Sequence, residues 1–447
     1  MNYTNSFCNN VQLSFGRRSF LKQCGLGIAS LSLVNLLDAA QPLHHAPKAK
    51  RVIHLFLHGG PSHLDTFDYK PEVNSKDGVT EGGGQIMGSP FKWEKAAGTD
   101  IWLPEIFPNL KSVAGHLCVI NSMNTDVPAH ELATLQMHTG STNFVRPSLG
   151  SLVTYGLGDI NKNLPSFVSL RAGGGSDPTL YQSAFLPGNF QGTPVDTQQS
   201  PDKIIENIIA VKGKTQRQQL DLISKLDILQ SQKNQTKDPE LDTRINSFEL
   251  AYKMQFEVPE TFDISKETEA TKAAYGNTPT GKQFLVARRL MEKGVRFVQI
   301  YNGSWDNHSD IKNAMAARGA DIDKPLTALV QDLKQRGLLK DTLIIISGEF
   351  GRTTHRDGIS NGFYGRGHWS RAFSAVLIGG GVKGGMVYGA TDALGQNIVS
   401  DKMHIHDLHA TVLHLLGFDH TKLTYRYGGR DFRLTDVEGQ VAQKIIA

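Results

Sequence analysis

The feature that most constrains this chain is a series of short apolar runs, rich in β-branched residues and bounded by turn residues. Continuous apolar runs of this length are typical of strands covered on both faces, as in a parallel sheet. Helical patterns lie between the runs, so strands and helices alternate. We therefore predict an α/β fold with a mainly parallel central sheet and helices on both faces. The runs occupy residues 52–57, 117–120, 297–300, 343–346 and 375–378.

Two of the segments between these runs have helical spacing and recognisable ends. The apolar residues of 326–333 fall on one helical face, with Pro325 suited to the first turn and Gly337 to the C-terminal cap. A second helix is expected over 284–291, ended by Gly294 and leading into the third predicted strand. Each segment completes a strand–helix–strand unit, which is how parallel strands are joined.

Residues 201–275 differ in character from the rest of the chain, being rich in Lys, Gln, Glu and Asp. Within them Leu222, Ile223, Leu226 and Leu229 form one apolar stripe at helical spacing. We predict a helical insertion in the form of a hairpin across the sheet edge or the cleft. A solvated cover without chemistry is the simpler alternative.

The first forty residues have the order of a twin-arginine signal peptide. Arg17 and Arg18 precede Phe-Leu-Lys, and a weakly apolar run over 25–37 follows, too short to span a bilayer. We predict that residues 1–40 are removed on export by the twin-arginine machinery to the periplasm or cell envelope. An ordinary basic N-terminal helix is the alternative. Lipid attachment at Cys24 is not expected, because Lys22 and Gln23 precede it where small residues belong.

Composition narrows the remaining possibilities for residues 41–447, which we take as one α/β domain. The formal net charge is +4 over 447 residues, and no basic cluster lies outside the leader, so a nucleic-acid partner is not expected. Cys118 is the only cysteine beyond the leader, so an intramolecular disulfide is excluded. No further membrane span is expected in the mature protein.

Histidines and acidic residues gather where the predicted strands end. Ligands of parallel sheets lie beyond the carboxyl ends of the strands, and imidazoles converging there with carboxylates are what a zinc or manganese site requires. Taken singly, each histidine is more simply a hydrogen-bonded structural residue. The candidate metal ligands from strand ends are His58, Asp306, His308, Glu349 and His368.

Six segments carry a resemblance along nearly the whole chain: 55–65, 305–308, 348–353, 379–385, 406–417 and 425–432. In these segments the chain resembles the domain-of-unknown-function 1501 family, sulfatase-like exported proteins related to the alkaline phosphatase and sulfatase superfamily. The resemblance implies an alkaline-phosphatase-like fold. It also implies a metal-dependent hydrolase of sulfate or phosphate esters, on a small molecule or a glycan.

Position by position, the chain departs from the enzymes of that superfamily. They place aspartates directly after the first strand, where this chain has His58, and a nucleophile where it has His130, which cannot become formylglycine. Their Asp-His-Gly or Asp-Asn-Gly becomes Glu349-Phe350-Gly351, in which Phe350 cannot bind a metal. We therefore expect an altered metal site that also includes His130. Its nitrogen-rich donors favour zinc or manganese over calcium.

The leading hypothesis is ester hydrolysis at this metal site, with His130 at the catalytic position. Arg352 is expected to hold an anionic oxygen bidentately, and a structural ion pair is its alternative. Ser62 and Thr134 are the nearest candidates for a nucleophile, although attack by metal-bound water fits better. The rival hypothesis is a non-catalytic exported protein of the same fold that binds anionic glycans or other ligands.

Overall fold

The computed structural model describes residues 40–171, 177–200, 204–205, 215–234 and 239–447. The predicted signal peptide, with Arg17 and Arg18, lies outside the described residues except for Ala40. Among the described residues, no helix combines the length and the apolar character that crossing a membrane requires.

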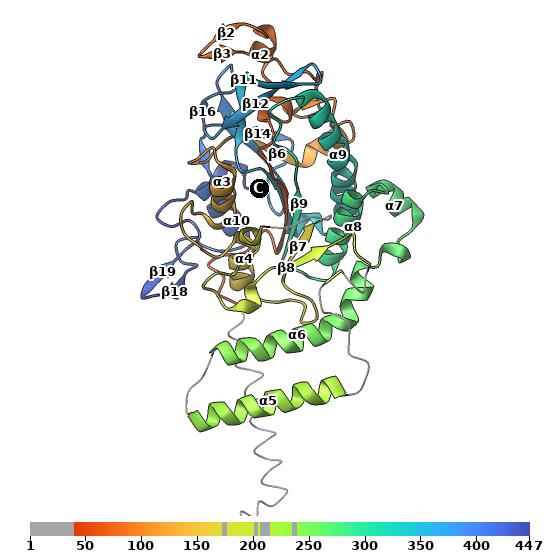
Figure 1. Cartoon of the computed structure of the whole chain (residues 1–447), viewed down its shortest axis with the longest axis vertical. Helices are drawn as coiled ribbons and strands as arrows, with labels where there is room; N and C mark the ends of the chain where they lie inside the picture. Colours follow the sequence, from red (N-terminus) through yellow and green to blue (C-terminus); the bar gives the residue numbers. More distant parts are fainter. Residues whose placement is uncertain (1–39, 172–176, 201–203, 206–214, 235–238) are drawn as a thin grey trace, which may run out of the picture.

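A nine-stranded sheet forms the centre of the molecule, in the order β14-β6-β13-β10-β1-β9-β7-β8, with β17 also paired to β6 (Figure 1). Only β13 runs against its neighbours, β10 and β6, and the other pairings are parallel. The predicted mainly parallel sheet is confirmed. The strands are β1 (Arg51–Leu57), β6 (Leu117–Asn124), β7 (Phe167–Arg171), β8 (Thr193–Asp196), β9 (Phe297–Asn302), β10 (Thr342–Ser347), β13 (Phe373–Gly379), β14 (Met386–Tyr388) and β17 (Met403–His404).

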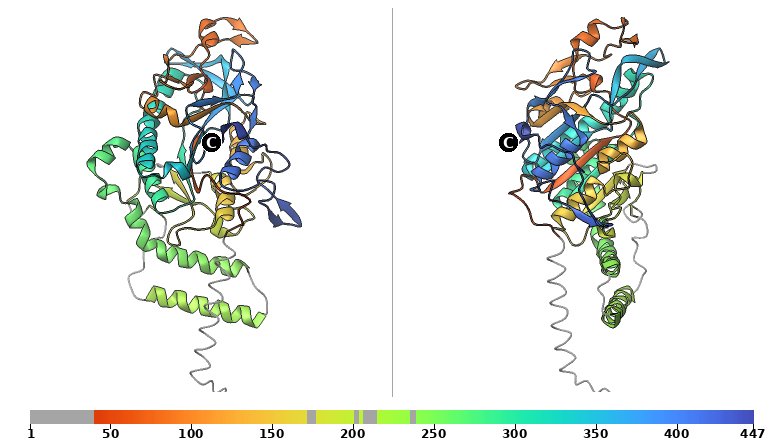
Figure 2. Two further views of the ribbon diagram at one scale, coloured as in Figure 1. Left: turned by 180° about the vertical axis from the view of Figure 1, so that it is seen from behind. Right: turned by 90° about the vertical axis from the view of Figure 1, so that its left-hand side faces the viewer.

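Helices cover both faces of this sheet, as predicted (Figures 1 and 2). Side chains alternate along a strand, so the central strand β1 contributes to both cores. Ile53, Leu55 and Leu57 pack with α8 (Pro279–Glu292) and α9 (Ile311–Gln335). Val52 and Phe56 pack with α4 (Leu149–Leu157) and α10 (Ile405–Leu415), on the face where α3 (His130–Thr139) also lies.

The helix α9 corrects one prediction. Pro325 is not in the first turn but inside the helix, which begins at Ile311. The proline removes one backbone hydrogen bond, and the buried apolar face that starts at Met315 and Ile322 continues through it. The predicted caps are confirmed, since Gly337 follows α9 and Gly294 follows α8, both with positive φ.

The described residues of 201–275 contain the helices α5 (Thr215–Asn234), α6 (Pro239–Phe262) and α7 (Glu269–Tyr275). In Figure 1, α6 lies next to the body of the molecule and α5 lies beyond it. The last turns of α6 pack into the core beside α8. On α5, Leu222 and Leu226 are more than half exposed, so the apolar stripe is not covered by the described residues.

Short hairpins complete the fold around the strand ends. The largest joins β11 (Gly351–Ser360) to β12 (Phe363–Trp369) and directly follows β10. The others are β2 (Thr80–Glu81) with β3 (Gly84–Gln85), β4 (Trp93–Lys95) with β5 (Trp102–Pro104), β15 (Ala390–Thr391) with β16 (Ile398–Ser400), and β18 (Tyr425–Tyr427) with β19 (Arg430–Phe432), together with the short helix α2 (Pro71–Ser75).

Candidate metal centre

The six predicted ligands meet at the carboxyl edge of the sheet. His58 follows β1, Asp306 and His308 follow β9, and Glu349 follows β10, three strands that are neighbours in the sheet. His368 lies in β12, just before β13. Because β13 is antiparallel, its beginning lies at the edge where the other strands end. His130, the first residue of α3, reaches the same place.

Hydrogen bonds fix the proton on each of three imidazole rings. Nδ1 of His130 lies 2.7 Å from Oε1 of Glu349, and Nδ1 of His308 lies 2.6 Å from Oδ2 of Asp357. Nδ1 of His368 lies 3.0 Å from the carbonyl oxygen of Pro128. A carbonyl or carboxylate oxygen only accepts, so Nδ1 carries the hydrogen and donates it. In each neutral ring, Nε2 is then left with a lone pair.

All three of these Nε2 atoms face one carboxylate, that of Asp306. They lie 3.0 Å (His308) and 3.2 Å (His368) from Oδ1 and 3.3 Å (His130) from Oδ2. The Nε2 atoms of His308 and His368 are 2.9 Å apart. Donors bound tetrahedrally to zinc at about 2.0–2.1 Å lie roughly 3.3 Å apart. We call His130, Asp306, His308 and His368 the edge cluster. Nitrogen lone pairs and a carboxylate that face one another at these distances require a proton or a cation between them.

Charges around the edge cluster shift two pKa values in opposite directions. Burial raises the pKa of Asp306, but the hydrogen bond and charge of Arg352, with His130, outweigh it and hold that pKa well below its usual range. Burial lowers the pKa of His130, but the hydrogen bond and charge of Glu349 and the charge of Asp306 raise it above its ordinary value. Asp306 is therefore ionised, as a metal ligand must be.

Arg352 does not have the role that we predicted for it. Its guanidinium group is buried and donates to the carbonyl oxygens of Gly59, Gly60 and Arg366. Its Nη2 also lies 2.5 Å from Oδ1 of Asp306. These contacts match the alternative, a structural ion pair: the side chain holds the Asp306 carboxylate in place, and its donors are taken up by the protein.

Glu349 and His58 lie on the other side of the His130 ring. The Glu349 carboxylate is fully buried and accepts the backbone N–H of Gly59 at 2.8 Å as well as the His130 hydrogen. The half-buried ring of His58 lies 5.9 Å from that of His130 and 5.5 Å from that of Tyr301, centroid to centroid. One donor atom each from His58, His130 and Glu349 fall within 4.8 Å of one another. His130 therefore belongs to two overlapping groups of donors.

Two glycines let the loops of this edge approach so closely. Gly59 has φ +114°, and a Cβ there would lie 2.4 Å from the backbone nitrogen of Asp306. A Cβ on Gly365 would lie 2.1 Å from the carbonyl carbon of His308. Any side chain at either position would push a loop carrying a cluster residue out of place.

The two nucleophile candidates, Ser62 and Thr134, have different surroundings. Ser62 is buried and donates to Asp65 at 2.6 Å, and Asp65 forms a buried ion pair with Arg366. Ser62 therefore belongs to a structural network, which corrects its candidacy. Thr134 is also buried, one turn along α3 from His130, and no hydrogen bond to its hydroxyl is formed among the described residues.

Sequence reasoning missed the two groups that hold imidazole hydrogens, namely Asp357 and the Pro128 carbonyl, and the ring of Tyr301 beside His58. Asp357 lies in the β11–β12 hairpin and has no motif around it. Phe350 was predicted only as a residue that cannot bind metal; its buried ring packs against those of His130 and His368, at 4.8 and 4.6 Å. Apolar packing behind these two rings limits their rotation and keeps their nitrogens toward Asp306.

Comparisons with known proteins give a family and three loose structural likenesses. Residues 49–446 match the model of a family described as "Protein of unknown function (DUF1501)". No curated protein matches the chain. The PsFucS1 sulfatase from Pseudoalteromonas sp. is 16% identical, with 89% of this chain and 72% of that chain covered and a TM-score of 0.35. The lipoteichoic acid synthase LtaP from Listeria monocytogenes is 12% identical (88% and 76% covered, TM-score 0.35).

The third structure is the alkaline phosphatase from the Antarctic bacterium TAB5, 12% identical, with 76% of this chain and 95% of that chain covered and a TM-score of 0.31. Because these TM-scores are low, the fold assignment rests on the strand order of the sheet, and the candidate metal centre rests on the distances between its own side chains.

Proposed function

We propose that this chain, which belongs to the family of proteins of unknown function DUF1501 as its motifs indicated, is a metal-dependent hydrolase of sulfate or phosphate esters. One observation carries the proposal: three imidazole Nε2 atoms face the Asp306 carboxylate at 3.0–3.3 Å while each Nδ1 hydrogen is held elsewhere. Metal-binding histidines characteristically donate their second N–H to a carboxylate or a backbone carbonyl.

The donors of the edge cluster fit a zinc or manganese ion better than calcium. His130, Asp306, His308 and His368 would hold it, with three nitrogens and one carboxylate, whereas calcium takes six to eight oxygen ligands. Glu349 would orient His130. With His58 it also supplies the second group of donors on the far side of that ring.

The edge cluster is open enough for a substrate to reach it. The side chains of Asp306 and His308 are 43% and 44% exposed. A divalent ion bound there would polarise an ester oxygen and lower the pKa of a water molecule. The protein's own part is to keep Asp306 ionised through Arg352 and to hold the three rings. Because Ser62 donates to Asp65 and Thr134 is buried, we propose water as the nucleophile at this site.

The protein is proposed to act outside the cytoplasm, after export by the twin-arginine machinery. The support is the leader sequence with Arg17 and Arg18. Replacing both arginines with lysine keeps the charge and should leave the precursor in the cytoplasm. Arrival of this variant in the cell envelope at the normal rate would contradict the proposal.

The test of the metal-dependent function is elemental analysis of untagged mature protein, combined with hydrolysis of 4-nitrophenyl sulfate and 4-nitrophenyl phosphate. We expect close to one equivalent or more of zinc or manganese, and loss of both metal and hydrolysis in Asp306→Asn and His368→Ala. The control is His116→Ala, which lies just before β6 at the opposite edge of the sheet. Metal-free wild-type protein would contradict the proposal. Bound metal without hydrolysis of any ester would favour the non-catalytic alternative.

A further inference from the structure

A second surface of the molecule, away from the edge cluster, combines stacked aromatic rings with arginines. The rings are Phe185, Tyr425, Tyr427 and Phe432, which we call the platform. Phe185 stacks on Tyr427 with centroids 4.9 Å apart and planes 12° apart, and it lies 4.9 Å from Phe432 and 6.0 Å from Tyr425. The three rings other than Phe185 come from the β18–β19 hairpin. Tyr427 is 55% exposed, so one end of the stack faces solvent.

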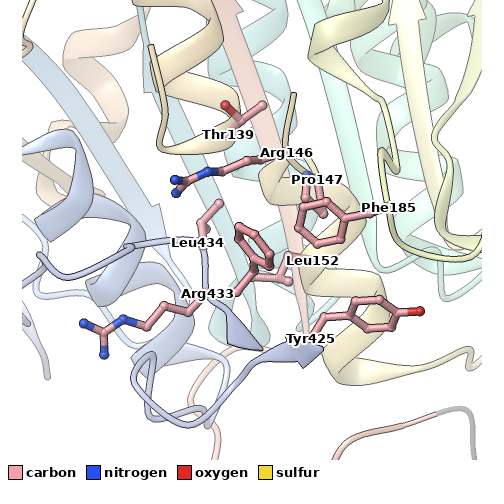
Figure 3. A pocket seen from close by; sticks show the side chains of 9 residues that line it. Thr139, Arg146, Pro147, Leu152, Phe185, Tyr425, Arg433 and Leu434 are labelled. Atoms are coloured by element: carbon pink, nitrogen blue, oxygen red, sulfur yellow. The ribbon is translucent and has the colours of Figure 1, made fainter. Parts of the chain in front are cut away.

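A pocket adjoins the platform, between the end of α3 and the start of α4. Figure 3 shows Arg146 and Pro147 above the pocket and Arg433 and Tyr425 below it, with Leu152 and Leu434 between them. Phe185, Tyr425 and Phe432 also line it. Exposed Phe144 and Val145 precede Arg146 in the chain. The hollow itself, at about 10 Å³, holds no more than a water molecule, so a larger ligand would lie across the exposed rings around it.

Positive charge surrounds the platform in excess. Arg426, Arg430, Arg433 and Arg146 lie on or beside the hairpin, and the acids among them are Asp431 and Asp436. Arg430 lies over the Phe432 ring at 5.0 Å and Arg146 at 5.9 Å. Arg426 pairs with Asp431 at 3.4 Å and Arg430 pairs with Asp436 at 2.7 Å. Both arginines are exposed, and exposed ion pairs contribute little to stability, so an external anion can compete for both guanidinium groups. In addition, the Nε of buried Arg146 has no hydrogen-bond partner within the described part of the chain.

We propose that the platform is a binding site for an anionic polysaccharide, separate from the edge cluster. A sugar ring has an apolar face of C–H groups that suits a flat aromatic ring, while its sulfate or carboxylate substituents suit guanidinium groups. Aromatic rings alternate with arginines on the platform, and an anionic polysaccharide presents sugar faces that alternate with charged substituents. The α3 helix sets the separation: it begins at His130 and ends at Thr139 beside the pocket, about 15 Å for its ten residues. A small ester at the edge cluster does not span that distance, and a polymer does.

Binding of dextran sulfate, alginate and neutral dextran to the mature protein, measured by affinity electrophoresis, tests this proposal. Wild-type protein should bind one or both anionic polymers and not neutral dextran. Tyr427→Ala, which leaves the charge unchanged, should weaken that binding about tenfold, and Arg430→Gln by a similar factor. The matched control is Phe256→Ala, a ring on α6 that is 66% exposed. Unchanged binding in both platform variants, or an equal loss in Phe256→Ala, would overturn the proposal.

The platform and the edge cluster are tested independently. Asp306→Asn should keep wild-type affinity for the anionic polymer, because the platform does not include the metal donors. Equal loss of polymer binding in Asp306→Asn would place the polymer at the edge cluster and overturn the separate site. Failure of the protein to bind any of the three polymers would also overturn the platform, and would leave the hydrolase proposal untouched.

Discussion

Two groups of histidines occupy opposite surroundings in this molecule, and the helix α3 carries a member of each. His130 begins α3 and belongs to the edge cluster, whereas His138, two turns later, is buried with His54 and His409. We call these three the buried row. His138 donates Nδ1–H to the Thr134 carbonyl at 2.9 Å, and His409 donates Nε2–H to the Met137 carbonyl at 2.8 Å. His54 hydrogen-bonds to Ser347 at 2.9 Å.

The difference between the groups lies in what the second ring nitrogen faces. In the edge cluster it faces the Asp306 carboxylate and solvent is near. In the buried row it has no hydrogen-bond partner among the described residues, and the neighbours are rings such as Phe56, whose centroid is 4.5 Å from that of His138. Burial lowers the pKa of His138 to about 4 and that of His409 to about 3. The buried row is thus neutral and structural, while the edge cluster needs a proton or a cation between its facing nitrogens and carboxylate.

The largest expected effect is on stability, from His409→Ala. Removing this fully buried ring leaves a cavity and an unsatisfied Met137 carbonyl, which should cost about 4 kcal/mol of unfolding free energy. Its counterpart in the edge cluster, His308→Ala, should cost less than about 1 kcal/mol in metal-free protein because its side chain is 44% exposed. Urea unfolding with a chelator present measures both. Equal losses of unfolding free energy in His409→Ala and His308→Ala would contradict the distinction between a structural buried row and an edge cluster that adds little to stability.

The next effect is a loss of stability in acid that comes from the buried row. His138 titrates near pH 6.5 when unfolded and near 4 when folded, so the unfolded state binds more protons between these values. The contribution of His138 to the free energy of unfolding should be fully present above pH 6.5 and should decrease as the pH falls. By pH 4 the free energy of unfolding should be lower by about 3 kcal/mol because of this residue.

The matched variant is His138→Asn, whose amide keeps a donor near the position of Nδ1 but does not titrate. Its unfolding free energy should fall less steeply between pH 6.5 and pH 4 than that of the wild type. Parallel pH profiles for the two proteins would show that His138 is not held neutral by burial.

The smallest predicted effect concerns Asp357, which orients His308 from outside the donor set. Asp357→Ala should weaken zinc binding by about 10- to 100-fold, as loss of such an orienting partner typically does. Competition with a chromophoric chelator measures the affinity. The control is Asp310→Ala, a nearby acid that bonds to Asn361 instead. A normal zinc affinity in Asp357→Ala would mean that His308 is not a ligand, which would remove one nitrogen from the edge cluster.

The sequence determined the architecture and the neighbourhood of the site. Apolar runs with helical patterns between them predicted β1, β6, β9, β10 and β13, because the burial of a strand on both faces leaves a continuous local pattern. It also predicted that His58, Asp306, His308 and Glu349 would gather, because parallel strands end at one edge. His130 came from resemblance alone, since no local pattern marks the first residue of α3 as part of that edge.

Only the tertiary structure decided what each group does there. Whether Arg352 meets a substrate or three carbonyl oxygens, and whether Ser62 is free or bonded to Asp65, depends on contacts with residues whose orientation no local pattern records. The same holds for the imidazole protons: His130 is oriented by a residue 219 positions away in the chain and His368 by one 240 positions away. Periodicity describes burial and direction along one element, whereas a hydrogen bond between elements exists only once the chain has folded.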